Sequence, residues 1–334
     1  MSSTNDQLSN RYEFLFYFDV ENGNPNGDPD FANHPRMDPQ DQHGLVSDVA
    51  LKRRIRNYVE LARGSESPYG IFIQHATNLN RSLAQAYESS GGLPVDKKGK
   101  PSKAGKDDVK RARKWMCEHF FDVRTFGAVM STGPNAGQVR GPAQIAFARS
   151  VDPIFTMDVT ITRMAKAIDL KAGATAEQYR EHEGEQPEDE LRTIGRKHVV
   201  PYALYCGKGF ISAHLARQTG FSKDDLRLLM ESVLNMYEHD RSASKGVMTV
   251  RPPIYVFKHV GTDTNTEQRE RQAMLGCAHA QDLFALVEPK VSMKDGVEVP
   301  RKFDDYSLPT LDDGEVMPGV ELIQVRSQAD LEKL

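Results

Sequence analysis

The sequence has no apolar run that approaches 18 residues, so we expect no membrane-spanning helix. Cysteine is scarce: Cys117, Cys206 and Cys277 lie far apart and form no C-x-x-C pair. The first ten residues, MSSTNDQLSN, lack the basic and apolar regions of a signal peptide. These three absences together predict a soluble protein of a reducing, cytoplasmic compartment.

Several motifs that define enzymes are also missing. The chain contains no G-x-x-x-x-G-K-[ST] phosphate loop, no G-x-G-x-x-G after a strand and no H-E-x-x-H metal motif. Two C-x-H pairs, at Cys117/His119 and Cys277/His279, have no companion ligands and are interpreted as packing and surface residues. We therefore expect no cofactor and no metal.

Charge is distributed unevenly along the chain. Residues 177–190 and residues 304–334 each have a net charge of −6, so that removing both from the total of −4 leaves +8 for the rest. Residues 97–114 hold nine Lys or Arg against two acids. A local basic field matters more for binding than the global sum, so a polyanion partner is compatible with the net negative charge.

The order of apolar segments predicts an α+β fold. The run YEFLFYFDV (residues 12–20) is typical of a buried strand, and a basic helix follows from Ser47 or Asp48 to about Arg63. Residues 69–77 could form a short strand, residues 199–215 a long strand or hairpin, and residues 252–260 a further strand. Residues 221–240 form a second helix, in which Ser222 and Asp225 make a capping box.

This order favours an antiparallel, ferredoxin-like sheet with helices on one face. We expect one such domain over residues 11–300, with insertions at about 90–110 and about 160–198 and an acidic tail over 301–334. Glycines at 127, 133, 137 and 141 within β-prone sequence suggest backbone brought close to a ligand or a neighbouring chain.

The stretch DVENGNPNGDPD (Asp19 to Asp30) has three readings. An EF-hand starting at Asn22 would place neutral amides where carboxylates belong and Asn33 at the twelfth position, which argues against calcium. Disorder is a second reading. The third is a shaped loop whose backbone N–H groups and amides meet phosphates or sugars.

Basic residues near the predicted sheet indicate binding of single-stranded RNA. Four of them lie on the first helix: Lys52, Arg53, Arg54 and Arg56. Arg124 follows the basic segment of residues 97–114, and Arg140 lies among the glycines. The simpler reading of each is a solvated surface charge. His34 and His43 could in principle serve RNA cleavage, although loop histidines are more often polar surface.

Four segments carry a resemblance to a known family. FDVENGNPNGDPD, HPRMDPQDQHGLVSDVALKRRIRNYVE, FDVRTFGAVMS and GQVRGPAQIAFARSVDPI resemble the backbone subunit of type I CRISPR surveillance complexes (Cascade), in particular the I-C form of this RAMP superfamily. The resemblance implies an RNA-recognition-motif-like palm with inserted fingers and thumb. It also implies several copies aligned head to tail on one CRISPR RNA, with other Cascade subunits, for antiviral defence in which the guide pairs with target DNA.

The resemblance also suggests particular contacts. The α-helical Lys52 and Arg56, with Arg53 and Arg54, would contact guide phosphates. The loop with Asn24 and Asn26, and the glycine-rich stretch with Gln138 and Arg140, would lie near the RNA or the adjoining subunit. The last two expected RNA contacts, Arg163 and Met164, fall where the thumb departs.

Two functional alternatives stay open at this point. Some members of the superfamily cut RNA, with a loop aspartate and a metal, and Asp28 and Asp30 could serve such an endoribonuclease. The I-C-like segments favour a non-enzymatic subunit without catalytic residues, because another subunit processes the guide in that subtype. A protein scaffold without RNA contact is the second alternative.

Overall fold

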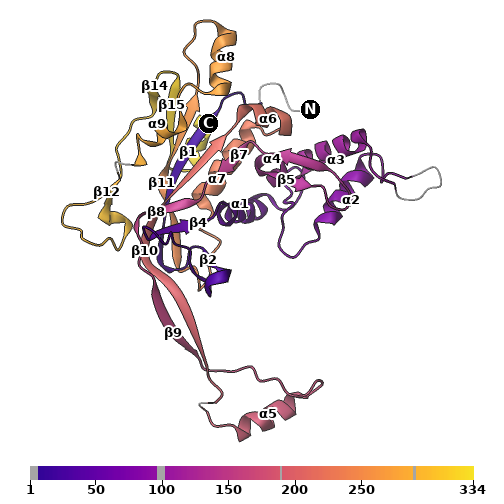
Figure 1. Ribbon diagram of the computed structural model, residues 1–334, viewed down its shortest axis with the longest axis vertical. Coiled ribbons are helices and arrows are strands. Elements are labelled where there is room, and N and C mark those ends of the chain that lie inside the picture. Colours follow the sequence, from indigo (N-terminus) through magenta and orange to yellow (C-terminus); the bar gives the residue numbers. More distant parts are fainter. Residues whose placement is uncertain (1–6, 96–101, 189, 289–290) are drawn as a thin grey trace.

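A large antiparallel sheet forms the centre of the molecule (Figure 1). The computed structural model describes residues 7–95, 102–188, 190–288 and 291–334. The three longest strands are β1 (Tyr12–Gly23), β10 (Thr193–Ile211) and β11 (Val247–His259), and β1 lies between the other two. The predicted α+β class with an antiparallel sheet is confirmed.

Four strands and two helices reproduce the expected ferredoxin-like order. Along the chain they are β1, α1 (Asp48–Arg63), β8 (Ala148–Pro153), β10, α7 (Lys223–Asn235) and β11. In the sheet the strands lie in the order β11-β1-β10-β8, so the first strand is flanked by the third and the fourth. This is the β-α-β-β-α-β topology with all neighbours antiparallel.

The helices α1 and α7 begin and pack as their sequences predict. Ser47 caps α1, and Ser222 and Asp225 form the capping box of α7. Each helix places an apolar stripe on one face of the sheet, where it meets alternate residues of β1. The main members of this core are Phe14, Phe16, Phe18, Leu51, Ile55, Val59, Leu226, Leu229 and Val233.

The opposite face of the sheet is also covered. Leu15 and Tyr17 of β1 and Tyr255 of β11 point to this side and belong to one buried cluster with Leu283 and Phe284 of α9 (Ala280–Phe284). Many RNA-recognition folds stack bases on exposed aromatic side chains of a sheet. The aromatic residues on this face are buried under the C-terminal segment and are not available for such stacking.

The sheet continues beyond the boundary expected at residue 300. Strands β14 (Gly314–Met317) and β15 (Val320–Val325) extend it, and β15 pairs with β11 from Ile254 to His259. Residues 320–325 are largely buried although the segment is acidic overall. The apolar residues of this short run, Val320, Leu322, Ile323 and Val325, rather than the net charge of the segment, explain its place in the sheet.

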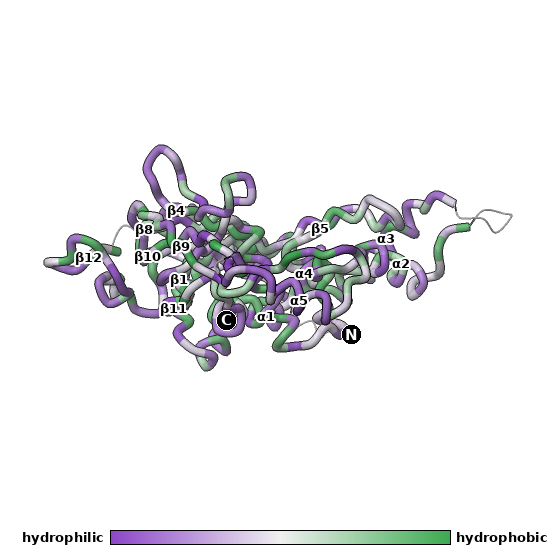
Figure 2. Tube along the Cα trace, turned by 90° about the horizontal axis from the view of Figure 1, so that it is seen from below, coloured by the Kyte–Doolittle hydropathy of each residue, from purple (hydrophilic) through white to green (hydrophobic). Residues whose placement is uncertain are grey.

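The first insertion is larger than predicted. Helices α2 (Leu79–Ser89), α3 (Lys106–His119) and α4 (Phe121–Phe126) and the hairpin β5–β6 (Gly127–Met130 and Gly137–Arg140) share a separate buried cluster. We call residues 70–140 the lobe. Residues 96–101 of the predicted basic loop lie outside the described residues. Figures 1 and 2 both place the lobe on one side of the sheet and β12 on the other.

The predicted strand over residues 69–77 is wrong. Only Gly70 forms an isolated bridge, with Phe120. The backbone N–H groups of Phe72 and Ile73 donate instead to the carboxylate of Asp122, at 2.8 and 3.1 Å. A side chain from a distant helix thus replaces a neighbouring strand as the hydrogen-bond partner.

The second insertion forms an arm that projects from the sheet (Figure 1). Strand β9 (Met157–Arg163) pairs with residues 193–199 of β10, and α5 (Ala176–Glu185) lies between them in the chain. We call residues 157–199 the arm; they include the segment of about 160–198 that the sequence analysis treats as an insertion.

The remaining elements are short. In the parts of the chain that the structure describes, no helix could span a membrane. In chain order the other elements are β2 (Gly27–Asp28), η1 (Pro29–Phe31), β3 (His34–Pro35), β4 (His43–Val46), β7 (Ala143–Ile145), α6 (Ala213–Thr219), α8 (Thr266–Leu275), β12 (Ser292–Met293), η3 (Phe303–Asp305), β13 (Tyr306–Ser307) and η4 (Gln328–Lys333).

Candidate nucleic-acid interface

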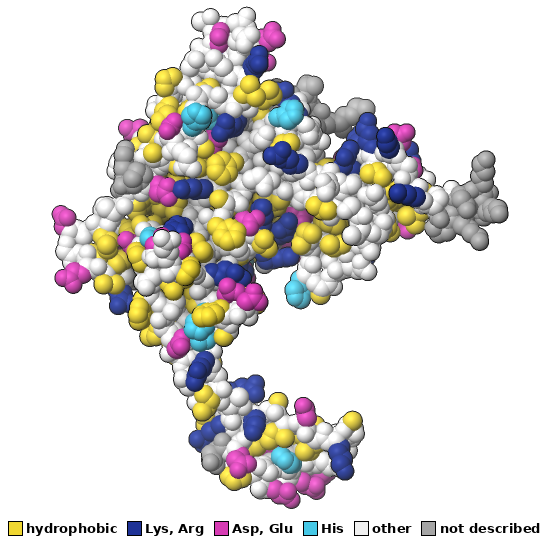
Figure 3. Space-filling model, viewed as in Figure 1, with side chains coloured by type: hydrophobic (Ala, Val, Ile, Leu, Met, Phe, Trp, Pro, Cys, Tyr) yellow, Lys and Arg dark blue, Asp and Glu magenta, His cyan; other side chains and the backbone are white. Residues whose placement is uncertain are grey.

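A basic cleft of about 550 Å³ separates the lobe from the sheet domain. One wall is α3, another is β6, and the third is the end of α6 with the residues that follow it. Among the described residues, five cationic side chains and one carboxylate, Glu118, line it. The cations are Lys110, Arg113, Lys114, Arg140 and Arg217. Figure 3 shows Lys and Arg side chains gathered over the lobe at α3.

Helical spacing explains why α3 points its cations into one cleft. Lys110, Arg113 and Lys114 follow the i, i+3, i+4 pattern, which places them on one face of a helix. All three are exposed, while Ala112 and Met116 face the buried cluster of the lobe. Lys114 lies 3.7 Å from Glu118. Among the described residues the other four cations of the cleft have no ion-pair partner, so their charge is available to an anion.

Close backbone contacts hold Arg140 at the edge of this cleft. Gly127 has a φ of +81°, and a Cβ atom there would lie 2.4 Å from the carbonyl oxygen of Val139. A Cβ at Gly141 would lie 2.3 Å from the backbone nitrogen of Gly127. Only glycine permits this packing of β5 on β6. Two of the four glycines that the sequence suggested as sites of close approach, Gly127 and Gly141, therefore bring two segments of this chain together beside Arg140.

A second hollow of about 410 Å³ shares Arg140 with the cleft. It runs along the other side of α6, past Gln144, His214 and Leu215. Arg11 also lines it, but its guanidinium is held by Glu13 at 2.5 Å. Arg140 therefore lines both hollows.

The cations of α1 are more enclosed than their sequence pattern suggests. Lys52 pairs with Asp48 at 2.9 Å, and Arg54 pairs with Asp240. Arg53 donates to the carbonyl oxygen of Ile73 at 2.8 Å, and burial lowers its pKa. All three side chains are half-buried.

Lys245 completes the ion-pair group at Asp240. Although burial opposes it, the hydrogen bond from Lys245 and the charge of Arg54 hold the pKa of Asp240 below its usual value. The carboxylate thus pairs with both Arg54 and Lys245, so Arg54 is already partnered.

Arg56 is a correction to the predicted RNA contacts. Its side chain is buried, its Nε donates to Asp122 at 2.7 Å, and its guanidinium lies over the ring of Phe126 at 5.2 Å. Asp122 in turn accepts from the backbone of residues 72 and 73, so the pair fastens the lobe to α1. Arg56 is therefore engaged within the fold, by Asp122 and the ring of Phe126.

Arg124 is a second correction. Only 5% of it is exposed, and it forms a two-pronged ion pair with Asp225, with distances of 2.9 and 2.7 Å. It also donates to the carbonyl oxygens of Pro68 and Cys117. Its hydrogen-bonding capacity is directed into the protein, where it connects α4 to the start of α7.

Side chains order the opening loop, residues 24–44, which follows β1. Asn24 donates to the carbonyl oxygen of Asn33 at 2.7 Å, and Asn26 accepts from the backbone of Ser47 at 2.9 Å. The buried Oδ1 of Asn24 has no hydrogen-bond partner among the described residues. Asp28 accepts from Arg36 at 3.2 Å and from the backbone of residue 30 at 3.1 Å.

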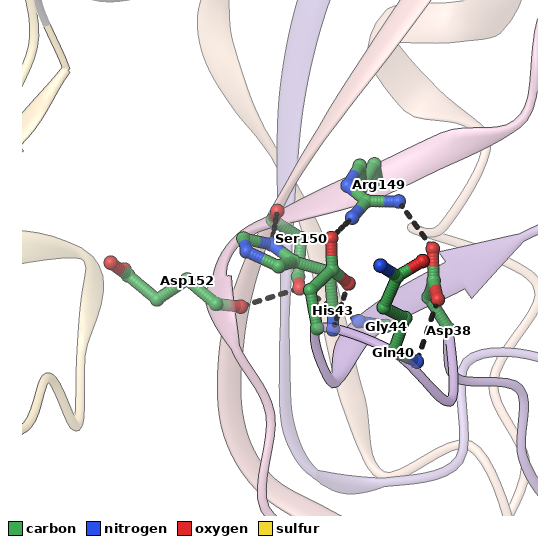
Figure 4. A network of polar contacts seen from close by, with 8 residues as sticks. Asp38, Gln40, His43, Gly44, Arg149, Ser150 and Asp152 are labelled. Carbon is green, nitrogen blue, oxygen red and sulfur yellow. Dashed lines mark hydrogen bonds and ion pairs between the residues drawn. The ribbon is translucent and has the colours of Figure 1, made fainter.

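The second half of the loop is fastened to β8 (Figure 4). Arg149 reaches Asp38 and Asp41, while Ser150 accepts from the backbone of Gly44 at 2.8 Å. Nδ1 of His43 lies 2.8 Å from the carbonyl oxygen of Ser150, an arrangement that orients the ring within the protein. These contacts favour the shaped-loop reading over disorder.

The arm holds the last two predicted residues. Arg163 is exposed at the end of β9 and donates to the carbonyl oxygen of Ala165, and the side chain of Met164 is 68% exposed. Neither residue lines the basic cleft. Of the predicted residues, only Gln138 and Arg140 line the basic cleft.

Lys110, Arg113, Lys114 and Arg217 are cleft residues that the sequence analysis did not single out. The signal for three of them was present, because they belong to the segment with nine bases in residues 97–114. Their spacing on one helical face would have identified them. Arg217 had no such signal, since it reaches the cleft only through the folding of α6 against the lobe.

Comparisons with known proteins agree on one family. The family model described as CRISPR-associated protein Cas7 matches residues 10–310. A relative named CRISPR-associated protein Cas7, from Haloferax volcanii, is 27% identical over 122 residues, which are 36% of this chain. The match spans about a third of the length of that relative, 33%.

Solved structures with a similar chain carry related titles. One, a CRISPR RNA-guided surveillance complex, pre-nicking, has a TM-score of 0.45 and 11% identity, covering 82% of this chain and 86% of that one. Another, a CRISPR RNA-guided surveillance complex, has a TM-score of 0.43 and 11% identity, covering 82% and 80%.

Proposed function

We propose, because this chain belongs to the family of CRISPR-associated protein Cas7, that its basic cleft holds the phosphate backbone of CRISPR RNA. The observation that carries the proposal is the cleft itself, with five cations and a single carboxylate. Lys and Arg neutralise phosphates without reading bases, which suits a subunit that must hold any guide sequence.

The burial of both sheet faces supports this location. Bases cannot stack on the aromatic residues of β1 and β11, because the C-terminal segment covers them. The cleft lies between the lobe and α6, and Arg140 lines both this cleft and the neighbouring hollow, whose other lining residues belong to the sheet domain. RNA that passes Arg140 would present its phosphates to both hollows.

We further propose that the chain is a non-catalytic backbone subunit of a type I-C surveillance complex in the cytoplasm. Copies that contact head to tail do not close into a ring and form a filament, whose length the guide RNA limits. Weak contacts at each copy add through effective concentration. Sequence recognition is left to pairing between guide and target DNA. Other complex subunits would process the guide and cap the filament.

The endoribonuclease alternative depends on a loop carboxylate that can hold a metal. Asp28 is engaged by Arg36 and by the backbone of residue 30, which supports a structural role for it. Incubation of labelled guide and target RNA with the protein and Mg²⁺ separates the two functions. Cleavage that is lost in Asp28→Ala would overturn the non-catalytic proposal.

The location of the RNA is tested by the salt dependence of binding. Five phosphate contacts to a single strand predict that the logarithm of the association constant falls with the logarithm of the salt concentration with a slope of about −3.5. Replacing three of the five cations predicts a slope of about −1.4. Raising salt from 50 to 200 mM should therefore weaken binding about 130-fold in the natural protein and about 7-fold in the variant. The variant is Lys110→Gln/Arg113→Gln/Arg140→Gln, measured with a fluorescent single-stranded RNA.

A matched variant controls for overall charge. Arg241→Gln/Arg301→Gln/Lys302→Gln removes three exposed cations outside the cleft and changes the net charge from −4 to −7, as the cleft variant does. It should keep the slope of the natural protein, because long-range charge is screened at these salt concentrations. Equal slopes in the two variants would place the RNA elsewhere.

A further inference from the structure

Three potential metal ligands meet where the arm leaves the sheet domain. They are His34 of β3, Asp158 of β9 and His198 of β10, and one donor atom from each lies within 4.8 Å of the other two. Nδ1 of His198 is 2.5 Å from a carboxylate oxygen of Asp158. The imidazole rings of His34 and His198 stack, with centroids 3.5 Å apart and planes inclined by 24°.

The donor atoms of this cluster suit a cation. A neutral imidazole offers a nitrogen lone pair, and the carboxylate adds a negative charge. The site thus has two nitrogen donors and one anionic oxygen donor.

We propose that His34, Asp158 and His198 bind a divalent transition-metal ion of the Zn²⁺ class. Two imidazoles with one carboxylate suit Zn²⁺ and its neighbours in the first transition row, whereas Mg²⁺ and Ca²⁺ prefer oxygen ligands. Three protein ligands leave a fourth position for water. The proposal is independent of the RNA-binding function and uses none of the cleft residues.

Small side-chain rotations suffice to close the site. Bonds of 2.0–2.2 Å in a tetrahedral site bring the ligand atoms to about 3.3 Å from one another. The present spread of up to 4.8 Å therefore has to contract by about 1.5 Å, with the two rings turning so that their lone pairs converge. Asp158 is exposed and the two histidines are half-buried, so the side chains have room to turn and an ion has access.

The bound ion would fasten the opening loop to the arm. His34 stands on the β2–β3 hairpin, which Asn24 and Asn26 hold against the sheet domain. The other two ligands face each other across the paired strands at the base of the arm, since Asp158 is the register partner of His198. Figure 1 shows the hairpin at this junction. The metal would thus fix the direction in which the arm projects.

The sequence hides this site because its ligands follow no short motif. Asp158 and His198 lie 40 residues apart, and His34 is far upstream of both. The antiparallel register of β9 with β10 brings the first two together, and the loop supplies the third.

Binding is tested on the full-length protein with Zn²⁺ and Co²⁺ as probes. After dialysis against EDTA, we expect one equivalent of Zn²⁺ to bind and to raise the unfolding temperature, and Co²⁺ to give the visible absorption of a tetrahedral site with nitrogen and oxygen ligands. The double variant His34→Ala/His198→Ala should weaken binding by more than about 100-fold, beyond the 10–100-fold effect of outer-shell substitutions.

His182→Ala serves as the matched control. His182 is a half-buried histidine on α5 of the arm and belongs to no metal-ligand cluster among the described residues. This control should bind Zn²⁺ as the natural protein does. Two results would overturn the proposal: no stoichiometric binding by the natural protein, or unchanged Zn²⁺ affinity in a folded His34→Ala/His198→Ala variant.

Asp158→Asn tests the third ligand, because it keeps the shape of the side chain and removes its charge. This variant should weaken Zn²⁺ binding without unfolding the arm. Unchanged Zn²⁺ affinity would remove Asp158 from the ligand set.

Discussion

Arg124→Met should destabilise the protein and leave its affinity for RNA unchanged. Methionine fills much of the volume of the arginine side chain but supplies no charge and no hydrogen-bond donor. The substitution therefore leaves the carboxylate of Asp225 buried without its cation, and the carbonyl oxygens of Pro68 and Cys117 without their donor. The backbone and hydroxyl of Ser222 remain as the only donors to that carboxylate in the recorded contacts.

The expected loss follows from the burial of both partners. The side chains of Arg124 and Asp225 are 6% and 4% exposed, so solvent cannot replace the missing cation. Removing one partner of a buried ion pair costs about 3–5 kcal/mol of unfolding free energy. At about 2 °C per kcal/mol, the value for larger chains, the unfolding temperature should fall by about 6–10 °C.

A double-mutant cycle separates the ion pair from other effects. Asp225→Asn keeps an oxygen that can accept from Ser222 but removes the charge, so Arg124→Met/Asp225→Asn should be more stable than Arg124→Met. Thermal unfolding measures stability, and RNA titration at 20 °C measures binding by the folded protein. An Arg124→Met variant that keeps its unfolding temperature but loses RNA affinity would refute the structural role and restore Arg124 as an RNA contact.

Two further predictions concern the lobe and the cysteines. Gly127→Ala should lower the free energy of unfolding by about 1–2 kcal/mol for an alanine in the left-handed region, and further because of the clash with Val139. Gly173→Ala is the control, because φ is also positive there but the space is open, so its loss of stability in thermal unfolding should be smaller. Equal losses would contradict the packing argument. Burial raises the pKa of Cys117 to about 11 and that of Cys206 to about 12, so the reactive thiolate of either residue is scarce at pH 8 and increases only as the pH approaches those values. After alkylation at pH 8, mass spectrometry should show at most one modified cysteine in the native protein and three in urea. A second rapid adduct in the native protein would contradict this prediction.

Local signals predicted the central elements of the fold well. The basic helix over 48–63 is bounded by Ser47 and Gly64, and Ser222 caps the second helix, as their sequences indicate. Capping and helical periodicity depend on residues within a few positions, so they can be read from the chain itself. The second helix ends at Asn235 rather than 240, because caps define its start and nothing comparable defines its end.

Long-range contacts account for the structural predictions that failed. The expected strand over 69–77 lacks a strand partner along its length, because Asp122 satisfies its backbone from 49 and 50 residues away. The acidic segment after residue 300 contributes β15 because β11 presents an edge to it. Neither the carboxylate nor the edge is visible in the local sequence, which shows only a β-prone run in one case and a net charge in the other.

The same reasoning explains why the candidate RNA surface moved from α1 to α3. Both helices are rich in bases, and composition alone cannot rank them. The carboxylates that neutralise Arg54, Arg56 and Arg124 lie 186, 66 and 101 residues away, respectively, so these cations look unpaired in the sequence and are paired in the fold. On α3, by contrast, the cleft cations Lys110 and Arg113 are exposed. A basic helix is a better candidate for binding phosphate when its cations lack carboxylate partners, and among the described residues this favours Lys110 and Arg113 of α3 over the paired cations of α1.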